Sequence, residues 1–144
     1  MSDLIKINLI KTRFDHLWAR KNNIFMPFFT LGDPDFERSF DLISSAIDAG
    51  ADCLELGIPF SDPIADGPVN QRSMARALSS GMNFDQALEL IKKIRDYAID
   101  IPIGLLLYYR DLSPWIGSIY KITFRGRCRC DSMWRFAHRR RPCV

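Results

Sequence analysis

The sequence of 144 residues has neither an apolar run long enough to cross a bilayer nor a secretory signal. Residues 1–20 mix charged residues with apolar residues at helical spacing, unlike the apolar core of a signal peptide. We therefore expect no membrane span and a location in the cytoplasm. With 47% hydrophobic residues, the composition is typical of one globular domain and not of a disordered chain.

Two kinds of ligand site are also missing. No glycine-rich cradle precedes a helix, since neither Gly57 nor the run Gly32-Asp33-Pro34 forms one, and this excludes a phosphate loop. A zinc site is not expected either, because the available ligands have a Cys-x-Cys spacing with a distant His and Cys, which does not match the paired spacings of such sites. These ligands are Cys128, Cys130, His138 and Cys143.

Charge and cysteine are distributed unevenly. From Arg110 onward the sequence has eight Arg and one Lys against two Asp, so this part carries a net +7, whereas the whole chain carries only +3. Three of the four cysteines and two of the three tryptophans also fall in this part. We place a composition boundary near Tyr109, between residues 1–109 and a basic tail of residues 110–144.

Residues 1–109 alternate between amphipathic helices and buried strands. Apolar residues at steps of three and four predict an opening helix that includes Leu17, and further helices between Asp35 and Gly50, over Gln71–Ser80, and after the cap Asn83. Apolar runs predict strands over Ile24–Thr30, around Leu54–Leu56, where Glu55 is the single polar residue, and over Ile101–Tyr108. Strands without polar alternation between such helices indicate a parallel α/β sheet. The pattern leaves open whether this sheet is flat or closed into a barrel.

The stretch from Cys53 to Pro68 combines the end of a strand with an acidic loop. Glu55 lies near the end of the strand, and Asp62 and Asp66 follow in a segment with three prolines and two glycines. Stiff loops of this kind carry function more often than they serve packing. Because active sites of parallel barrels form at the carboxyl ends of the strands, Glu55 and Asp66 could face one pocket.

Three segments resemble the tryptophan synthase alpha chain family, in that family's order and spacing. They are Pro27–Pro34, Leu54–Pro68 and Ile101–Tyr108. The resemblance implies that residues 1–109 form the first three βα units of a TIM (βα)8 barrel, preceded by a helix. It also implies a lyase of tryptophan biosynthesis, which cleaves indole-3-glycerol phosphate to indole and glyceraldehyde 3-phosphate.

The resemblance assigns roles to individual residues. Glu55 matches the glutamate that transfers a proton, and Asp66 matches the aspartate that binds the indole N–H. Both roles suit the reaction, because indole leaves only when its ring carbon is protonated and the charge at its nitrogen is stabilised. Residues matching the lining of the indole pocket are Phe28, Leu106 and Tyr108.

Further implications of the resemblance concern partners and cofactors. Pro59, Phe60 and Asp62 match a part of the loop that faces the beta chain in the family's alpha2beta2 tetramer. The pyridoxal phosphate of that complex belongs to the beta chain, so no cofactor is expected on this chain. The small-molecule substrate is the other expected ligand, with no nucleic acid and no membrane.

The sequence also departs from the family after Tyr109. Arg110 stands where the family usually has Asn, and the later strands that hold the substrate phosphate cannot be recognised. We therefore expect an unstructured or out-of-frame tail and an inactive chain. Codons for Trp134–Val144, read one base later, permit Gly-Val-Leu-Leu-Ile-Val-Asp-Val-Pro-Val, which resembles the family's fourth strand. Two alternatives stay open: a non-catalytic module that docks a beta chain, and a basic-tail protein that binds nucleic acid.

Overall fold

Three parallel strands form the centre of the computed structural model, which describes residues 12, 13, 15–17, 19 and 23–107. β1 (Phe28–Thr30), β2 (Leu54–Gly57) and β3 (Ile103–Leu106) lie in the order β1-β2-β3. α2 (Phe36–Asp48) connects β1 to β2, and α3 (Pro68–Ser79) and α4 (Phe84–Tyr97) connect β2 to β3. The described residues before β1 that lie between 12 and 19 are helical. The expected parallel βαβ pattern is confirmed.

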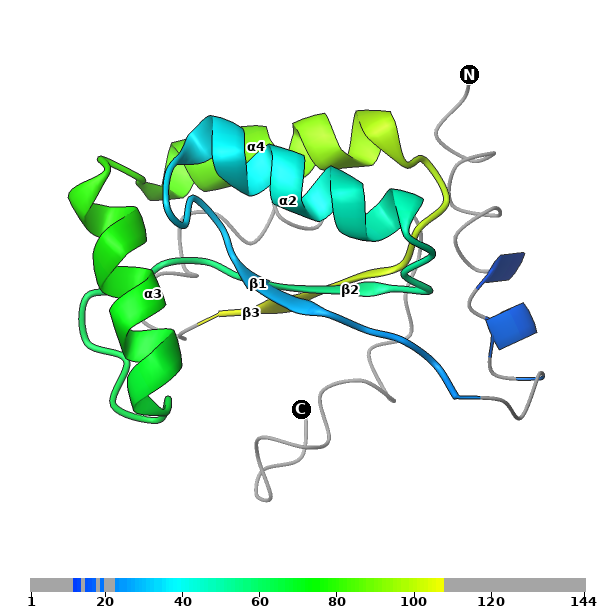
Figure 1. Cartoon of the computed structure of the whole chain (residues 1–144), viewed down its shortest axis with the longest axis horizontal. Helices are drawn as coiled ribbons and strands as arrows, with labels where there is room; N and C mark the ends of the chain where they lie inside the picture. The colour runs from blue at the N-terminus through cyan, green and yellow to red at the C-terminus, as the bar shows by residue number, and fades with distance from the viewer. Residues whose placement is uncertain (1–11, 14, 18, 20–22, 108–144) are drawn as a thin grey trace, which may run out of the picture.

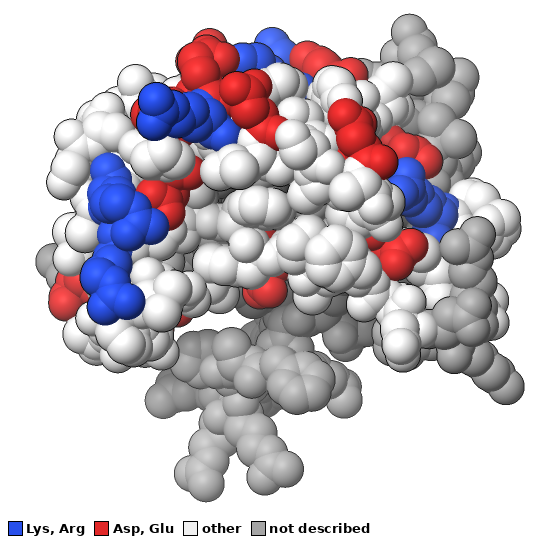
Figure 2. Space-filling model, in the orientation of Figure 1, with Lys and Arg blue, Asp and Glu red and all other residues white. Residues whose placement is uncertain are grey.

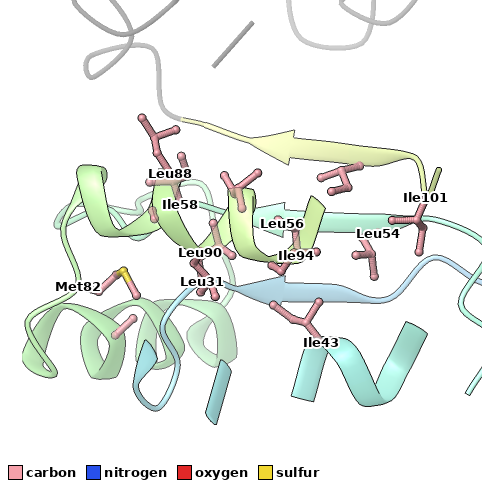
Figure 3. Close-up of a cluster of buried hydrophobic side chains, with 14 of the residues drawn as sticks. Leu31, Ile43, Leu54, Leu56, Ile58, Met82, Leu88, Leu90, Ile94 and Ile101 are labelled. Atoms are coloured by element: carbon pink, nitrogen blue, oxygen red, sulfur yellow. The ribbon is translucent and has the colours of Figure 1, made fainter. Parts of the chain in front are cut away.

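The core lies between the sheet and two helices, α2 and α4. Figure 1 shows these helices side by side on one face of the sheet, with α3 standing apart at the end of the sheet. Leu54 and Leu56 of β2 point toward the helices, where Ile43 of α2 and Ile94 of α4 are fully buried (Figure 3). Burial of such aliphatic side chains is the main force that holds the helices on the sheet.

The helix ends follow the capping residues expected from the sequence. Asp35 caps α2 by accepting a hydrogen bond from the backbone N–H of Arg38, and Asn83 forms a reciprocal capping box with Gln86 at the start of α4. Gly50 follows the end of α2 with a φ of +97°, a conformation that glycine adopts without strain.

Three predicted boundaries need correction. The strand predicted over Ile24–Thr30 is confined to Phe28–Thr30, and Ile24, Phe25 and Met26 are exposed. The strand begins after Pro27 because proline has no N–H to donate, although its carbonyl still accepts from the N–H of Glu55.

The other two corrections concern β3 and α3. Among the described residues, the third strand covers Ile103–Leu106 of the predicted range, and it begins after Pro102 because proline has no N–H to donate. α3 begins at Pro68, three residues before Gln71, because proline is favoured in the first turn, where its missing N–H costs nothing.

In the described ranges, every helix is too short or too polar to cross a membrane. The same residues contain no group of three or more His, Cys, Asp or Glu placed to hold a metal ion. The tail predicted for residues 110–144 lies outside the described residues, as do Tyr108, the tail's basic residues and its cysteines.

Candidate active site

Glu55 lies on the face of the sheet that α2 and α4 leave uncovered. Side chains alternate along a strand, and Leu54 and Leu56 occupy the helix-covered face, so Glu55 points to the opposite one. Phe28 is the register partner of Glu55 in β1, and Leu106 is the partner of Gly57 in β3. The sheet therefore brings three of the predicted site residues, Phe28, Glu55 and Leu106, to one face.

Two glycines lie beside Glu55 on this face of the sheet. The Phe28 ring lies over Gly57, where an added Cβ would come within 2.9 Å of the ring's Cζ. On the other side, Gly104 is the register partner of Glu55, and an added Cβ there would meet nothing closer than the Leu54 carbonyl oxygen at 3.7 Å. Among the residues that the structure describes, the half-buried Glu55 thus has Phe28 as its neighbour on one side and a glycine without a side chain on the other.

Thr30 adds a polar group to the same face. It lies two residues after Phe28 and opposite Gly57, and it is buried. Its hydroxyl has no hydrogen-bond partner in the part of the chain that the structure describes. The sequence pattern could have placed Thr30 on this face, because it follows from the two-residue period of Phe28.

The acidic loop leaves the sheet directly after Gly57 and ends at Gly67, the N-cap of α3. Asp66 is half-buried at the end of this loop, and its backbone N–H donates to the carbonyl of Pro63 at 3.1 Å. Gln71 in the first turn of α3 donates to the carbonyl of Asp66 at 2.9 Å. The loop therefore holds Asp66 beside the start of α3, at the end of the strand that carries Glu55.

The residues predicted to contact a partner lie in the middle of the loop. Asp62 is exposed, and Pro59 and Phe60 are half-buried. This exposure makes the loop accessible to another protein.

A group of residues that the sequence analysis did not single out lies next to this loop. Asp33, in the connection from β1 to α2, accepts hydrogen bonds from Arg76 Nε at 2.8 Å and Arg76 Nη2 at 2.6 Å, and also from the Ser73 hydroxyl. These bonds, with Arg76 as the main contributor, hold the pKa of Asp33 below its ordinary value. No local pattern could have revealed the contact, because 43 residues separate Asp33 from Arg76.

A groove between α2 and α4 is the other candidate site, and it lies on the opposite side of the sheet from Glu55. Lys93 occupies it, with its Nζ 2.7 Å from Glu37 Oε2 and 4.3 Å from the centre of the Phe40 ring. Figure 2 shows acidic and basic side chains interleaved over these helices. Lys93 is already paired with Glu37 and lies against the Phe40 ring, so the groove is a weaker candidate site than the Glu55 face.

A comparison with known families shows to which family the chain is related. The model of the tryptophan synthase alpha chain family matches residues 14–117, which include every described element of the sheet. The chain belongs to the tryptophan synthase alpha chain family. Its match runs eight residues past Tyr109, where the sequence analysis places the composition boundary.

Individual relatives agree with the family match. The tryptophan synthase alpha chain of Cronobacter sakazakii is 53% identical over 95 residues, which cover 66% of this chain and 35% of the relative. The solved alpha subunit from Legionella pneumophila is 36% identical with a TM-score of 0.68, over 74% of this chain and 41% of that one. A tryptophan synthase complex from Pyrococcus furiosus is 39% identical with a TM-score of 0.58, over 64% and 37% of the two chains.

These matches establish the fold as the first three βα units of a TIM (βα)8 barrel. The chain spans about a third of the length of the curated relatives it matches. In a complete barrel of this kind, the strand face that carries Glu55 points to the interior, and the loop with Asp66 lies at the catalytic end.

Proposed function

We propose that the chain carries the catalytic carboxylates of a lyase that cleaves indole-3-glycerol phosphate to indole and glyceraldehyde 3-phosphate. The observation that carries the proposal is the position of Glu55, which shares the uncovered face of the sheet with Phe28 and Leu106. An acid beside an aromatic ring and an aliphatic side chain suits a flat apolar substrate that must be protonated on carbon.

The division of labour between the two carboxylates follows from the reaction. Glu55 delivers a proton to C3 of the indole ring as the bond from C3 to the glycerol carbon breaks, and that carbon becomes an aldehyde as its hydroxyl loses a proton. Asp66 accepts a hydrogen bond from the ring N–H, where positive charge develops. Phe28, Leu106 and Tyr108 line the indole site in this proposal. No redox step or cofactor is needed, because the protons and electrons balance within the substrate.

The proposal also includes a partner and a location. The relative from Pyrococcus furiosus is a tryptophan synthase complex, and we propose that Pro59, Phe60 and Asp62 contact a tryptophan synthase beta chain. The exposed position of Asp62 supports this role. A biosynthetic enzyme of this kind would act in the cytoplasm.

A further part of the proposal concerns the boundary in the chain. Residues 1–109 would form the barrel units, and residues 110–144 would form a basic tail that is unstructured or translated out of frame. Because the described sheet has three parallel strands and a barrel pocket is enclosed by eight, we expect the 144-residue chain alone to turn over far more slowly than a complete barrel. The nucleotide sequence across codons 108–144 tests the reading-frame part directly.

A graft tests the catalytic part. Residues 23–107 would replace the matching segment of the Cronobacter sakazakii alpha chain, and cleavage of indole-3-glycerol phosphate would be followed by release of indole. We expect the graft to be active and Glu55→Gln or Asp66→Asn to lower kcat by roughly a hundredfold or more. Asp62→Asn is the matched control: it should leave the activity of the isolated graft unchanged and weaken binding of a beta chain.

The outcomes separate the proposed roles. An active graft that is insensitive to both Glu55→Gln and Asp66→Asn would remove the catalytic proposal. Binding of a beta chain by the 144-residue chain, together with an inactive graft, would favour the non-catalytic docking module instead.

A further inference from the structure

Asp33 joins two parts of the chain that the candidate active site depends on. Its carboxylate receives a two-pronged pair of hydrogen bonds from Arg76 and a third from Ser73, which lies one turn earlier on α3. The Asp33 side chain is only 17% exposed, although that of Arg76 is 55% exposed. Paired guanidinium–carboxylate bonds fix both distance and orientation, so Asp33 holds α3 in one position against the β1–α2 connection.

The connection that carries Asp33 is itself held in place. Gly32 has a φ of +81°, and its N–H donates to the buried hydroxyl of Ser39 at 3.0 Å. Met82 packs against Gly32 so closely that an added Cβ would come within 2.2 Å of the Met82 Cε. The Asp33 N–H donates to the carbonyl of Thr30, the last residue of β1. Asp33 therefore moves with the strand that pairs with β2.

α3 in turn holds the end of the acidic loop. Gln71 in its first turn donates to the carbonyls of Asp66 and Pro63, at 2.9 and 3.3 Å. By contrast, Gly67, the N-cap of α3, makes no side-chain cap bond, and Ile64 and Ala65 in the loop are exposed. α3 thus contributes to holding Asp66, together with the loop's own bond from the Asp66 N–H to the carbonyl of Pro63.

These contacts form one mechanical path between the two carboxylates. It runs from Glu55 through the β2–β1 register to Asp33, across the hydrogen bonds to Arg76, and along α3 to Asp66. Figure 1 shows α3 at the end of the sheet, separate from α2 and α4, so it lacks the support that those two helices give each other. Figure 2 shows basic side chains gathered over this end of the molecule, with acidic groups beside them.

We propose that Asp33, Ser73 and Arg76 are positioning residues, which set the location of Asp66 relative to Glu55 by anchoring α3 to the β1–α2 connection. The proposal rests on the proposed function, because it assigns Asp66 a task in the reaction. It goes further by naming three residues that act on the geometry of the two carboxylates through α3 and the β1–α2 connection.

Hydrogen exchange on the 144-residue chain tests the anchoring without any need for turnover. Asp33→Asn and Arg76→Gln should speed exchange of the amides of Ile64, Asp66 and Gln71 roughly tenfold. In these variants the loop and the first turn of α3 can open without breaking the hydrogen bonds between Asp33 and Arg76. The amides of α2 and α4 should keep their rates. Arg72→Gln, at an exposed arginine on the same helix, is the matched control and should change nothing.

A uniform rise over all amides would show a purely stabilising role and would overturn the proposal, as would unchanged loop amides. Ser73→Ala removes one of the three bonds and keeps the ion pair, so it provides a milder variant if the others fail to fold. It should give a smaller increase at the same amides.

Kinetics in the graft test the consequence for catalysis. The hydrogen bond from the indole N–H to Asp66 matters mainly in the transition state. A displaced Asp66 loses this bond, so Asp33→Asn should lower kcat roughly tenfold or more with little change in KM. Arg76→Lys keeps the charge but loses the two-pronged geometry, and it should fall between Arg76→Gln and the parent.

The results also separate this inference from the proposed function. Loop amides that loosen while kcat stays unchanged, in a graft that Asp66→Asn still inactivates, would overturn the positioning role and leave the function standing. Turnover insensitive to both Glu55→Gln and Asp66→Asn would remove the function, and the exchange result would then stand alone as evidence for the anchor.

Discussion

Two charged residues in the described part of the chain are held in place for different reasons. Asp33 has an ion-pair partner at the surface, whereas Arg95 is buried with only 7% exposure and donates from one nitrogen to the carbonyls of Ala98, Ile99 and Ile101. Burial lowers the pKa of Arg95 to about 10, so it stays charged at neutral pH. Its guanidinium supplies a donor to these carbonyls in the connection between α4 and β3.

Removal of the Arg95 side chain should therefore be costly. Arg95→Ala removes the donor to the buried carbonyl of Ile101 and to the partly buried carbonyls of Ala98 and Ile99, and it should lower the free energy of unfolding by about 2 to 3 kcal/mol. Lys92→Ala, at an exposed position of the same helix, should change it by less than about 0.5 kcal/mol. Urea denaturation of the chain and both variants measures this difference. An equal decrease in the free energy of unfolding for the two variants would mean that water replaces Arg95 as the hydrogen-bond donor to these carbonyls.

The Asp33 ion pair predicts a pH dependence. Its pKa is lowered from the usual 3.8 in the folded chain, so the unfolded chain binds the proton more tightly. The contribution to stability is thus fully present above pH 3.8 and is lost as the pH falls through the lower, folded value. Thermal unfolding of the parent and Asp33→Asn should differ most near neutral pH and converge in acid. A gap that stays constant down to pH 2 would contradict this assignment.

At the scale of the helices and strands, the sequence predicts well which segments are helices and which are strands, but it predicts poorly the residues at which they begin and end. Asp35 and Asn83 predict the starts of α2 and α4, because capping is a local interaction between neighbours in sequence. The start of β1 is set by pairing with a strand more than twenty residues away, so the apolar run from Ile24 suggests a longer strand than the one that forms. The shared face of Phe28, Glu55 and Leu106 follows from register and could be expected only once the strand order was assumed.

The anchor of α3 could not be predicted from the sequence. Asp33 looks like a turn residue, and Arg76 looks like a solvated helix residue, until folding brings them together across 43 positions. The same holds for Gly32 and Met82, whose contact joins the β1–α2 connection to the residues after α3. Contacts of this kind depend on tertiary packing, which residue patterns do not record.

Gly32 offers a test of that packing, with Gly50 as its matched control. Both have positive φ, so alanine at either position should cost about 1 to 2 kcal/mol in backbone strain. Only at Gly32 would the new methyl group also collide with Met82, adding about 1 to 3 kcal/mol. Chemical denaturation of Gly32→Ala and Gly50→Ala compares them directly. Equal destabilisation would show that Met82 moves aside freely.

At the scale of the whole molecule, the described fold has two unlike faces. α2 and α4 cover one face of the sheet and bury its aliphatic core, while the other face presents Phe28, Thr30, Glu55 and Leu106. Membership of the tryptophan synthase alpha chain family explains the second face, because the interior of a (βα)8 barrel is lined by alternate residues of its strands. We propose that this second face receives the indole ring.

Backbone amide resonances followed during a titration of the chain with indole would show where indole binds. We expect the largest shifts at Glu55, Gly57, Gly104 and Leu106, with none at Glu37 or Lys93 in the groove between α2 and α4. Glu55→Gln, which keeps the shape of the site, should retain the same pattern. Shifts confined to the groove between α2 and α4, or the absence of saturable shifts on the sheet, would show that indole does not bind to this face.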